Sequence, residues 1–173
     1  ADAVRQSLEA LAWLRGQGAE QILFKYCSTF DSTPQGNIGP VTDALMAALG
    51  TDRTIVCPGY PCYGRTTWRG HLFVGDRLLN ESGMEKHPLN PMTDPDIRRW
   101  LRRQTAGAVG LVPYAVVRQG AAAIRAALDA DAAAGTRLTV VDAVADEDLV
   151  AIGKAVVADT LITGGSGIAL GLP

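Results

Sequence analysis

Short apolar runs alternate with longer stretches of helical character along most of the chain, and this rhythm constrains the fold more than any other feature. The runs expected to form strands are residues 21–26, 54–57, 108–112, 138–141 and 160–163. The stretches expected to form helices are residues 4–14, 40–49, 118–134 and 146–157, with a further helix opened by Asp94 and Pro95. Strands that alternate with helices favour a mostly parallel sheet covered on both faces. We therefore predict an α/β fold with three layers, α/β/α.

One stretch departs from this alternation. Residues 71–79 hold two short runs rich in apolar residues around Gly75 and Asp76, which is the pattern of a β-hairpin with a two-residue turn. The irregular stretch 80–93 follows, and irregular segments of this length in a compact domain are usually functional or disordered. The sequence thus predicts one β-hairpin excursion from the mostly parallel sheet.

The composition argues against several classes of function. A formal net charge of -2 leaves no basic footprint for nucleic acid, and 6% aromatic residues are few for stacking on single strands. No apolar run approaches the roughly 20 residues that span a bilayer. The three cysteines, Cys27, Cys57 and Cys62, show no metal-type spacing with the two histidines, and their odd number fits a reducing compartment. We expect a cytoplasmic protein with no nucleic-acid partner, no membrane association and no metal site in this chain.

A polar segment, residues 25–40, follows the first predicted strand. Lys25 and Asp31 lie after the carboxyl end of that strand, where open α/β sheets place their ligands. Hydroxyl groups that can donate or accept hydrogen bonds are added by Ser28, Thr29, Ser32 and Thr33. The helix expected from Pro40 points its first amides at the same place, which suits an anion, and a lysine at a strand end is costly unless it finds one. The segment predicts a site for a polar, negatively charged ligand; the alternative is a loop whose hydroxyls bond local backbone groups.

Two further groups of basic residues are weaker candidates. Arg65 follows the second predicted strand and would face the same crevice if the second and third strands are neighbours, and arginine suits the capture of a carboxylate or phosphate. From the sequence alone, the interpretation of Arg65 as a solvated loop arginine is favoured over this one. A dense basic cluster on the helix after Asp94 indicates a charged outer face or a contact with an acidic partner domain: Arg98, Arg99, Arg102 and Arg103.

The histidines and the last glycine-rich segment carry less specific signals. His71 begins a predicted strand and is expected to be structural, whereas His87 in the irregular stretch is a candidate for substrate contact or proton transfer. Residues 164–167 resemble a phosphate loop only in their glycine content, because the following Lys-Ser/Thr and the GxGxxG spacing are both missing. They predict a tight strand-to-helix turn, with anion binding as the alternative.

Several segments together resemble the four-carbon acid sugar kinase family, and most closely its 3-oxo-tetronate kinase branch. The resemblance begins with KYCSTFDST at residues 25–33 and GNIGP at residues 36–40. Further matches follow in the family's order: GRT at 64–66, LFVGD at 72–76, LNES at 79–82, HPLNPMTD at 87–94 and TGGSG at 163–167. These segments cover essentially the whole chain, and a colinear set is far more specific than any one of its members.

The resemblance implies an ATP-dependent kinase of two domains. Its N-terminal α/β domain binds a four-carbon sugar acid, and its C-terminal domain binds ATP with Mg²⁺. Residues 1–173 would form the sugar-acid-binding N-terminal domain, incomplete at its start because the family's opening Asp-Asp-x-Thr-Gly segment is absent. The nucleotide-binding domain would lie beyond Pro173, so no cofactor-binding residue is expected here and the chain alone is expected to be inactive.

Individual roles follow from this resemblance together with the chemistry of phosphoryl transfer. That reaction depends on positioning and charge neutralisation, so the acceptor domain must hold the sugar hydroxyl in line. Lys25 and Arg65 are expected to contact the carboxylate or the incoming phosphoryl group. Asp31 is expected to bind the acceptor hydroxyl and is a candidate base, beside the aspartates of the absent segment. Lys25 and Asp31 are the predicted catalytic residues, and the further predicted substrate contacts are Ser28, Ser32, Thr33, Asn37, Arg65 and His87.

Two functional hypotheses therefore remain open at the level of sequence. The first is the acceptor half of a kinase for the 4-hydroxyl of a sugar acid such as 3-oxo-tetronate, with the C-terminal domain as its partner and a homodimer as a candidate assembly. The second is a non-catalytic module that binds a sugar acid or a protein, since some relatives carry type III effector labels.

Overall fold

The computed structural model describes residues 2–172, so the two ends of the predicted domain, residues 1 and 173, lie outside the described residues. Its centre is a sheet in the order β1-β8-β2-β7-β6, in which all neighbouring strands run parallel. The strands are β1 (Ile22–Lys25), β2 (Thr54–Cys57), β6 (Ala108–Val112), β7 (Thr136–Val141) and β8 (Leu161–Gly164). The predicted strands are confirmed, with bounds that agree to within two residues.

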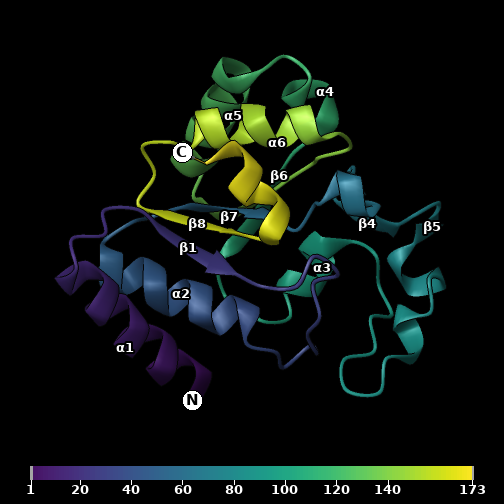
Figure 1. The fold of residues 1–173 in the computed structure, drawn as a ribbon, viewed down its shortest axis with the longest axis horizontal. Coiled ribbons are helices and arrows are strands. Elements are labelled where there is room, and N and C mark those ends of the chain that lie inside the picture. Colours follow the sequence, from purple (N-terminus) through teal and green to yellow (C-terminus); the bar gives the residue numbers. More distant parts are fainter. Residues whose placement is uncertain (1, 173) are drawn as a thin grey trace.

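Helices cover both faces of this sheet (Figure 1). On one face lie α1 (Asp2–Gly16), α2 (Ile38–Leu49) and α3 (Ile97–Leu101). On the other lie α4 (Tyr114–Val117), α5 (Ala121–Ala133) and α6 (Asp146–Ala155), followed after β8 by the 3₁₀ segment Ser166–Gly171. The predicted three-layer α/β/α architecture is confirmed. Among the residues described here, no helix is both long and apolar enough to cross a membrane.

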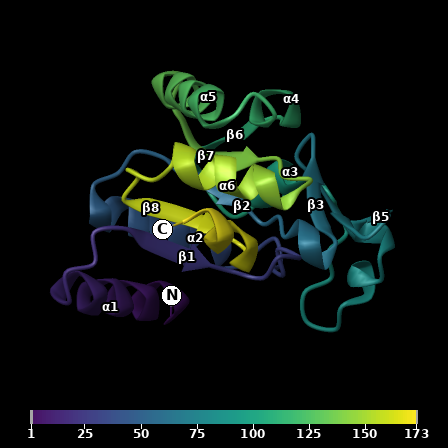
Figure 2. The same ribbon diagram turned by 45° about the horizontal axis from the view of Figure 1, so that its top comes forward.

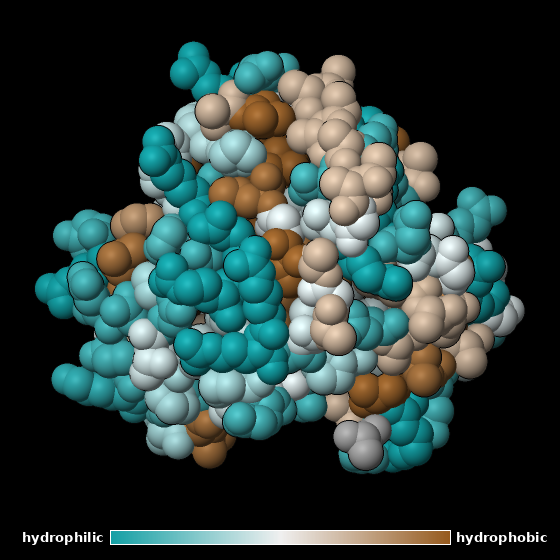
Figure 3. Space-filling model, turned by 180° about the vertical axis from the view of Figure 1, so that it is seen from behind, coloured by the Kyte–Doolittle hydropathy of each residue, from teal (hydrophilic) through white to brown (hydrophobic). Residues whose placement is uncertain are grey.

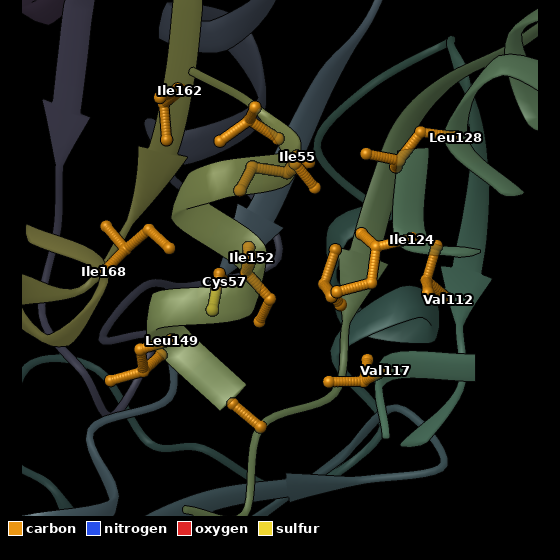
Figure 4. Packing of buried hydrophobic residues seen from close by; sticks show 14 residues of the cluster. Ile55, Cys57, Val112, Val117, Ile124, Leu128, Leu149, Ile152, Ile162 and Ile168 are labelled. Atoms are coloured by element: carbon orange, nitrogen blue, oxygen red, sulfur yellow. The ribbon is translucent and has the colours of Figure 1, made fainter. Parts of the chain in front are cut away.

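Three buried clusters hold the layers together, one of which packs α1 and α2 against β1 and β8. Above the sheet, Leu149 and Ile152 of α6 pack between Ile162 and Ile168 on one side and Ile124 of α5 on the other (Figure 4). Another cluster, on the opposite face, draws on α2, α3 and the segment after β1, and its large fully buried side chains include Phe30 and Trp100. The surface seen from behind is mainly hydrophilic, and its more apolar areas form separate patches (Figure 3).

A small antiparallel sheet lies beyond the carboxyl ends of the main strands (Figure 2). Its strands are β3 (Arg65–Trp68), β4 (His71–Val74) and β5 (Arg77–Leu78), so the predicted hairpin is confirmed and β3 is an addition. The turn between β3 and β4 consists of Arg69 (φ 51) and Gly70 (φ 75). A left-handed arginine is uncommon, and this explains why the sequence did not indicate a second hairpin.

Three predicted helix bounds were wrong. The second helix begins at Ile38, so Pro40 is its third residue, where a missing amide hydrogen still costs no intrahelical bond. The helix predicted at 118–134 corresponds to α5, which begins only at Ala121 because Gly120 before it has a φ of 91°, and α4 is a further short helix that precedes the predicted range. Asp96 rather than Asp94 caps α3, since its carboxylate accepts from the amides of the first turn.

The arginine cluster on and after α3 is largely balanced within the chain. Arg98 pairs with Asp96 at 2.8 Å, and Arg99 pairs with Asp94 at 2.7 Å. Two further interactions engage the rest of the cluster: Arg102 donates to the Val109 carbonyl at 2.8 Å, and Arg103 lies 5.1 Å above the ring of Trp100. These contacts favour the interpretation of a charged outer face.

Asp96 makes the free energy of unfolding of the domain depend on pH. Burial raises the pKa of Asp96, but the hydrogen bonds and charge of Arg98 outweigh it and lower that pKa overall. The stabilising contribution of Asp96 is therefore complete above its ordinary pKa of about 3.9 and is lost as the pH falls through the lower folded-state value. We expect Asp96→Asn, which keeps a capping oxygen, to lower the free energy of unfolding by about 1–3 kcal/mol at pH 7.

Urea unfolding of both proteins at a series of pH values checks this prediction. The difference between wild type and Asp96→Asn should stay constant above about pH 5 and shrink below about pH 4. Asp52, which is exposed, supplies the matched control Asp52→Asn. A difference that does not change with pH would contradict the ion-pair origin of the effect.

Candidate active site

The polar segment predicted as a site lies at the carboxyl edge of the main sheet. Lys25 ends β1 beside Gly164 of β8, and Gly164 in turn pairs with Cys57 at the end of β2. Residues 26–37 then run from β1 to the start of α2. The segment therefore opens onto the edge where parallel α/β sheets hold their ligands, as its position after a strand predicted.

A buried aromatic residue fixes the shape of this loop. Phe30 is fully buried and has a φ of 56°, a conformation that L-residues adopt rarely. Its ring packs edge-on against Tyr26 with 5.2 Å between centroids, and its amide donates to the Cys27 carbonyl at 2.9 Å. A strained residue persists only where its surroundings over-determine it, so residues 26–32 form a pre-shaped rather than a loose segment.

Ser32 is committed to the fold. Its hydroxyl donates to the Phe30 carbonyl at 2.9 Å and accepts from Trp100 Nε1 at 3.1 Å and from Gln104 Nε2 at 2.9 Å. A serine hydroxyl has one hydrogen to donate and two lone pairs, so these contacts use all of its capacity. This geometry leaves no position for the predicted sugar contact at Ser32, which instead anchors the loop.

Gln104 occupies the place at the start of α2 that the sequence suggested for an anion. Its side-chain oxygen accepts from the Gly39 amide at 3.1 Å, and its side-chain nitrogen donates to the Thr33 carbonyl at 2.8 Å. A Cβ atom at Gly39 would lie 2.6 Å from the Gln104 carbonyl oxygen, so glycine is required there. The prediction that the first amides of this helix bind the ligand is therefore wrong for the Gly39 amide, which is already bound to Gln104. No local signal in the sequence connects Gln104 with this loop.

Polar atoms remain available along the same loop. Asp31 Oδ1 accepts from the Thr29 hydroxyl at 2.6 Å, and the Thr29 oxygen lies 3.0 Å from Cys27 Sγ. The side chain of Asn37 is exposed and does not cap α2. Two further predicted contacts, Ser28 and Thr33, are half-buried. The structure thus brings together most of the predicted polar residues on one loop.

Lys25 differs from its prediction in one respect. It is exposed, because β1 is an edge strand with β8 as its neighbour in the described sheet. Water can therefore solvate its ammonium group, and the argument that burial forces Lys25 to find an anion does not hold. Its position at the strand end beside Gly164 keeps it a candidate contact.

Arg65 belongs to a different sheet from the one predicted. It begins β3 in the small sheet, so it does not belong to a neighbour of β2 in the main sheet. Strand alternation places it on the same face as Thr67, whose amide donates to the Ala143 carbonyl just after the end of β7 at 2.8 Å. One terminal nitrogen of Arg65 donates to the Tyr63 carbonyl.

Two buried polar atoms, one in the small sheet and one in the turn that follows it, have no partner within residues 2–172. They are Arg65 Nε and Asn80 Oδ1. Buried polar groups in proteins are nearly always hydrogen-bonded, so each of these atoms points to a further partner such as a ligand or a water molecule. Sequence reasoning had singled out Arg65 and had missed Asn80 as a candidate.

The histidines hold turns in place. His87 Nδ1 accepts from the amides of Leu89 and Asn90 at 3.3 and 3.0 Å, which leaves only its Nε2 for the predicted substrate contact. His71 Nδ1 donates to the Arg69 carbonyl at 3.0 Å, in agreement with its predicted structural role.

Residues 164–167 form a close-packed turn rather than a phosphate loop. A Cβ atom at Gly164 would lie 2.5 Å from the Cys57 carbonyl oxygen, and one at Gly165 would lie 2.7 Å from the Pro58 carbonyl oxygen. Glycine is needed here because the ends of β8 and β2 approach so closely. The tight turn that the sequence predicted is therefore confirmed, although a 3₁₀ segment follows it. Within the described chain, no cluster of three or more His, Cys, Asp or Glu residues is arranged to hold a metal ion.

Comparison with protein families matches residues 1–172 to the sugar-binding N-terminal domain. The chain belongs to this family. Among its relatives, the 3-oxo-tetronate kinase of Burkholderia multivorans is 59% identical over 173 residues, which are 100% of this chain and 40% of the relative. The 3-oxo-tetronate kinase of Salmonella typhimurium is 50% identical over 171 residues, 99% of this chain and 41% of the relative. The sugar-binding domain thus spans about 40% of the length of these curated relatives, and the resemblance stated from its motifs is confirmed.

Solved structures agree with this assignment. A Haemophilus influenzae protein matches with a TM-score of 0.96 and 48% identity, over 98% of this chain and 41% of that one. A Bordetella bronchiseptica protein, described as a domain-swapped dimer with bound citrate, matches with a TM-score of 0.77 and 27% identity, over 98% of this chain and 40% of that one. The fold of the sugar-binding domain is therefore shared with experimentally determined relatives.

The sugar-binding domain also contains a buried carboxylate that sequence reasoning missed. Asp142 follows β7, is fully buried, and accepts from three amides: Arg69 at 2.7 Å, Gly70 at 2.9 Å and Tyr114 at 2.9 Å. Burial raises the pKa of Asp142, against the opposing effect of these amides and of the Arg98 charge. Asp142 therefore fastens the turn of the small sheet to the carboxyl ends of β6 and β7.

Proposed function

We propose that this domain binds the acceptor of an ATP-dependent kinase that phosphorylates the 4-hydroxyl of a four-carbon acid sugar such as 3-oxo-tetronate. The observation that carries the proposal is the pre-shaped loop 26–37 at the carboxyl edge, with polar atoms left available along it. The relatives that match almost the whole of this chain are named 3-oxo-tetronate kinases, and their names support this assignment.

The available groups suit a small hydroxylated carboxylate. Arg65 Nε is a buried donor that lacks a partner in the described chain, and it would bind the substrate carboxylate with help from Lys25. Hydroxyl groups of the sugar would bond to Asp31, Thr33 and Asn37, with Ser28 at the mouth of the loop. A relative of similar fold was crystallised with citrate, which is a polycarboxylate, and this supports the choice of a carboxylate ligand.

Phosphoryl transfer asks little covalent chemistry of the acceptor domain. Asp31 would orient the attacking hydroxyl and accept its proton through Oδ2, while Thr29 holds Oδ1 at 2.6 Å. Because Lys25 and Arg65 hold the carboxylate at the other end of the substrate in this proposal, the charge that develops as the phosphoryl group arrives would be neutralised by the ATP-binding part of the longer protein. The rigid loop would keep the hydroxyl in line with its target, and such positioning lowers the barrier of a transfer reaction.

ATP and Mg²⁺ belong, in this proposal, to the remainder of a longer protein. The described residues do not fit them. Neighbouring backbone occupies the space beside the glycines at 164–167, so a phosphate has no room there. Asp31 is the one carboxylate of its loop and has, within the described chain, no second acidic residue beside it to hold Mg²⁺. A C-terminal nucleotide-binding domain, which the resemblance to the kinase family implies, would supply both. Reaction in the cytoplasm and assembly as a homodimer are further parts of the proposal.

A coupled assay of the complete protein tests this function. With ATP and Mg²⁺, it should release ADP in step with phosphorylation of a tetronate from a panel of four-carbon acids. Absence of turnover with every acid in the panel, together with binding of a tetronate by calorimetry, would favour the alternative of a non-catalytic module. Absence of both would overturn the proposed site.

Arg65→Gln provides a residue-level prediction. It should raise the KM for the tetronate about 10- to 100-fold, since a hydrogen bond to a charged group is worth about 1.5–3 kcal/mol. Arg77→Gln is the matched control, because Arg77 is an exposed arginine of the same small sheet. Equal KM values for Arg65→Gln and wild type would remove Arg65 from the carboxylate site.

A further inference from the structure

A pocket lies at the β6 end of the carboxyl edge, away from the loop at 25–37. It has a volume of 550 Å³, and its walls come from the β3–β4 turn, from α3 and from the end of β6. The lining residues that matter here are Trp68, Arg69, His71, Arg98, Pro113 and Tyr114. Its position at β6 puts it across the full width of the sheet from β1, roughly 19 Å away at about 4.8 Å per strand.

The pocket combines an aromatic wall with exposed positive charge. Trp68 and Tyr114 contact each other with 5.2 Å between ring centroids, and 43% of Trp68 remains exposed. The backbone amide of Arg69 donates to Asp142. The Arg69 guanidinium has no hydrogen-bond or ion-pair partner among residues 2–172. Such surfaces bind planar groups by stacking and anions by charge-assisted hydrogen bonds.

The acidic residues nearby leave the charge of Arg69 uncompensated, although Asp96 pairs with Arg98. The Asp142 carboxylate is fully buried and engaged with three backbone amides. Asp96 accepts from Nε and Nη2 of Arg98, which leaves the second terminal nitrogen of that guanidinium uncommitted. His71 donates through Nδ1 to the Arg69 carbonyl, and this bond leaves the other ring nitrogen, Nε2, available.

The cationic side of the pocket is held rigidly. Arg69 has a φ of 51° in a two-residue turn whose amides are both bound by Asp142. A Cβ atom at Gly70 would lie 2.8 Å from Arg98 Nε, so glycine lets this guanidinium pack against the turn. The backbone of Arg69 and the guanidinium of Arg98 are thus fixed before binding, which reduces the entropy lost when the pocket binds an anion.

We propose that this pocket is a separate ligand site for a small organic anion that carries a planar ring, with the ring on Trp68 and Tyr114 and the negative group on Arg69 and Arg98. The volume supports a ligand of this size, because pockets for cofactor-sized molecules range from about 300 to 1,000 Å³. A four-carbon acid would leave most of it empty. The site shares no predicted residue with the loop at 25–37.

Adenosine monophosphate is the probe, and the complete protein is titrated while the indole signal of Trp68 is followed by NMR. Trp68→Phe identifies that signal. We expect a saturable shift with adenosine monophosphate and a much smaller one with adenosine or ribose 5-phosphate, which lack the charge and the ring respectively. Arg69→Ala should weaken binding about 10- to 100-fold, whereas Arg118→Ala, a control at an exposed arginine beyond α4, should bind as wild type does.

The outcome is independent of the proposed kinase reaction. Phosphorylation of tetronates by Arg69→Ala should match the wild type, since Arg69 has no part in the acceptor site. An unshifted Trp68 signal at millimolar adenosine monophosphate would overturn the proposal, and so would equal shifts with adenosine or equal affinity in Arg69→Ala. These results would leave the assignment of the loop at 25–37 untouched.

Discussion

The complete protein with Asp31→Asn is expected to lose about 10²- to 10⁴-fold in kcat for a tetronate, with little change in KM. The introduced asparagine would keep the oxygen that accepts from Thr29 at 2.6 Å, so the loop retains its shape. The second oxygen, which would take the proton of the attacking hydroxyl, becomes an amide group without basicity. The loss should therefore fall on the chemical step rather than on binding.

Steady-state kinetics of wild type, Asp31→Asn and Asp52→Asn measure this effect. Asp52 is an exposed carboxylate at the opposite, amino edge of the sheet just before β2, so its replacement should leave both constants unchanged. Thermal unfolding establishes that each variant is folded. A kcat for Asp31→Asn within about threefold of wild type would exclude Asp31 as the base.

The second large effect is expected at Asp142. Asp142→Ala should lower the free energy of unfolding by about 3–5 kcal/mol, because it leaves three amides, one buried and two part-buried, without an acceptor. Each unsatisfied buried group costs about 1–3 kcal/mol, and relaxation of the turn recovers part of that sum. The turn at Arg69 would also lose the contact that holds its left-handed backbone, so the pocket beside it should bind its ligand more weakly.

Urea unfolding measures the stability change, and the exposed Asp76 in the β4–β5 turn supplies the control Asp76→Ala, expected within about 0.5 kcal/mol of wild type. Where Asp142→Ala fails to fold, Asp142→Asn offers a milder test, since its amide oxygen can keep one or two of the three contacts. A free energy of unfolding equal to that of wild type in either variant would show that the carboxylate does not fasten the small sheet.

The elements of the main sheet were predictable because their signals are local. The strand at Ala108–Val112 was predicted with its observed bounds, and the second strand at Thr54–Cys57 was as well. A short apolar run between turn residues requires only the neighbouring sequence to be recognised. The strand β3 was missed for the converse reason, because its turn uses Arg69 in a conformation that arginine rarely adopts.

For the candidate site, the sequence determined the place, and the tertiary structure decided which atoms there are available. A strand, a polar loop and a helix in succession suffice to put residues 25–37 at the carboxyl edge of a parallel sheet. Whether a hydroxyl or an amide in that loop is free depends on partners far along the chain: Ser32 is saturated and Gly39 is bound because Gln104, more than 60 residues away, packs against them. Asp142 and the pocket at the β6 end arise in the same way, since long-range packing rather than local periodicity selects those contacts.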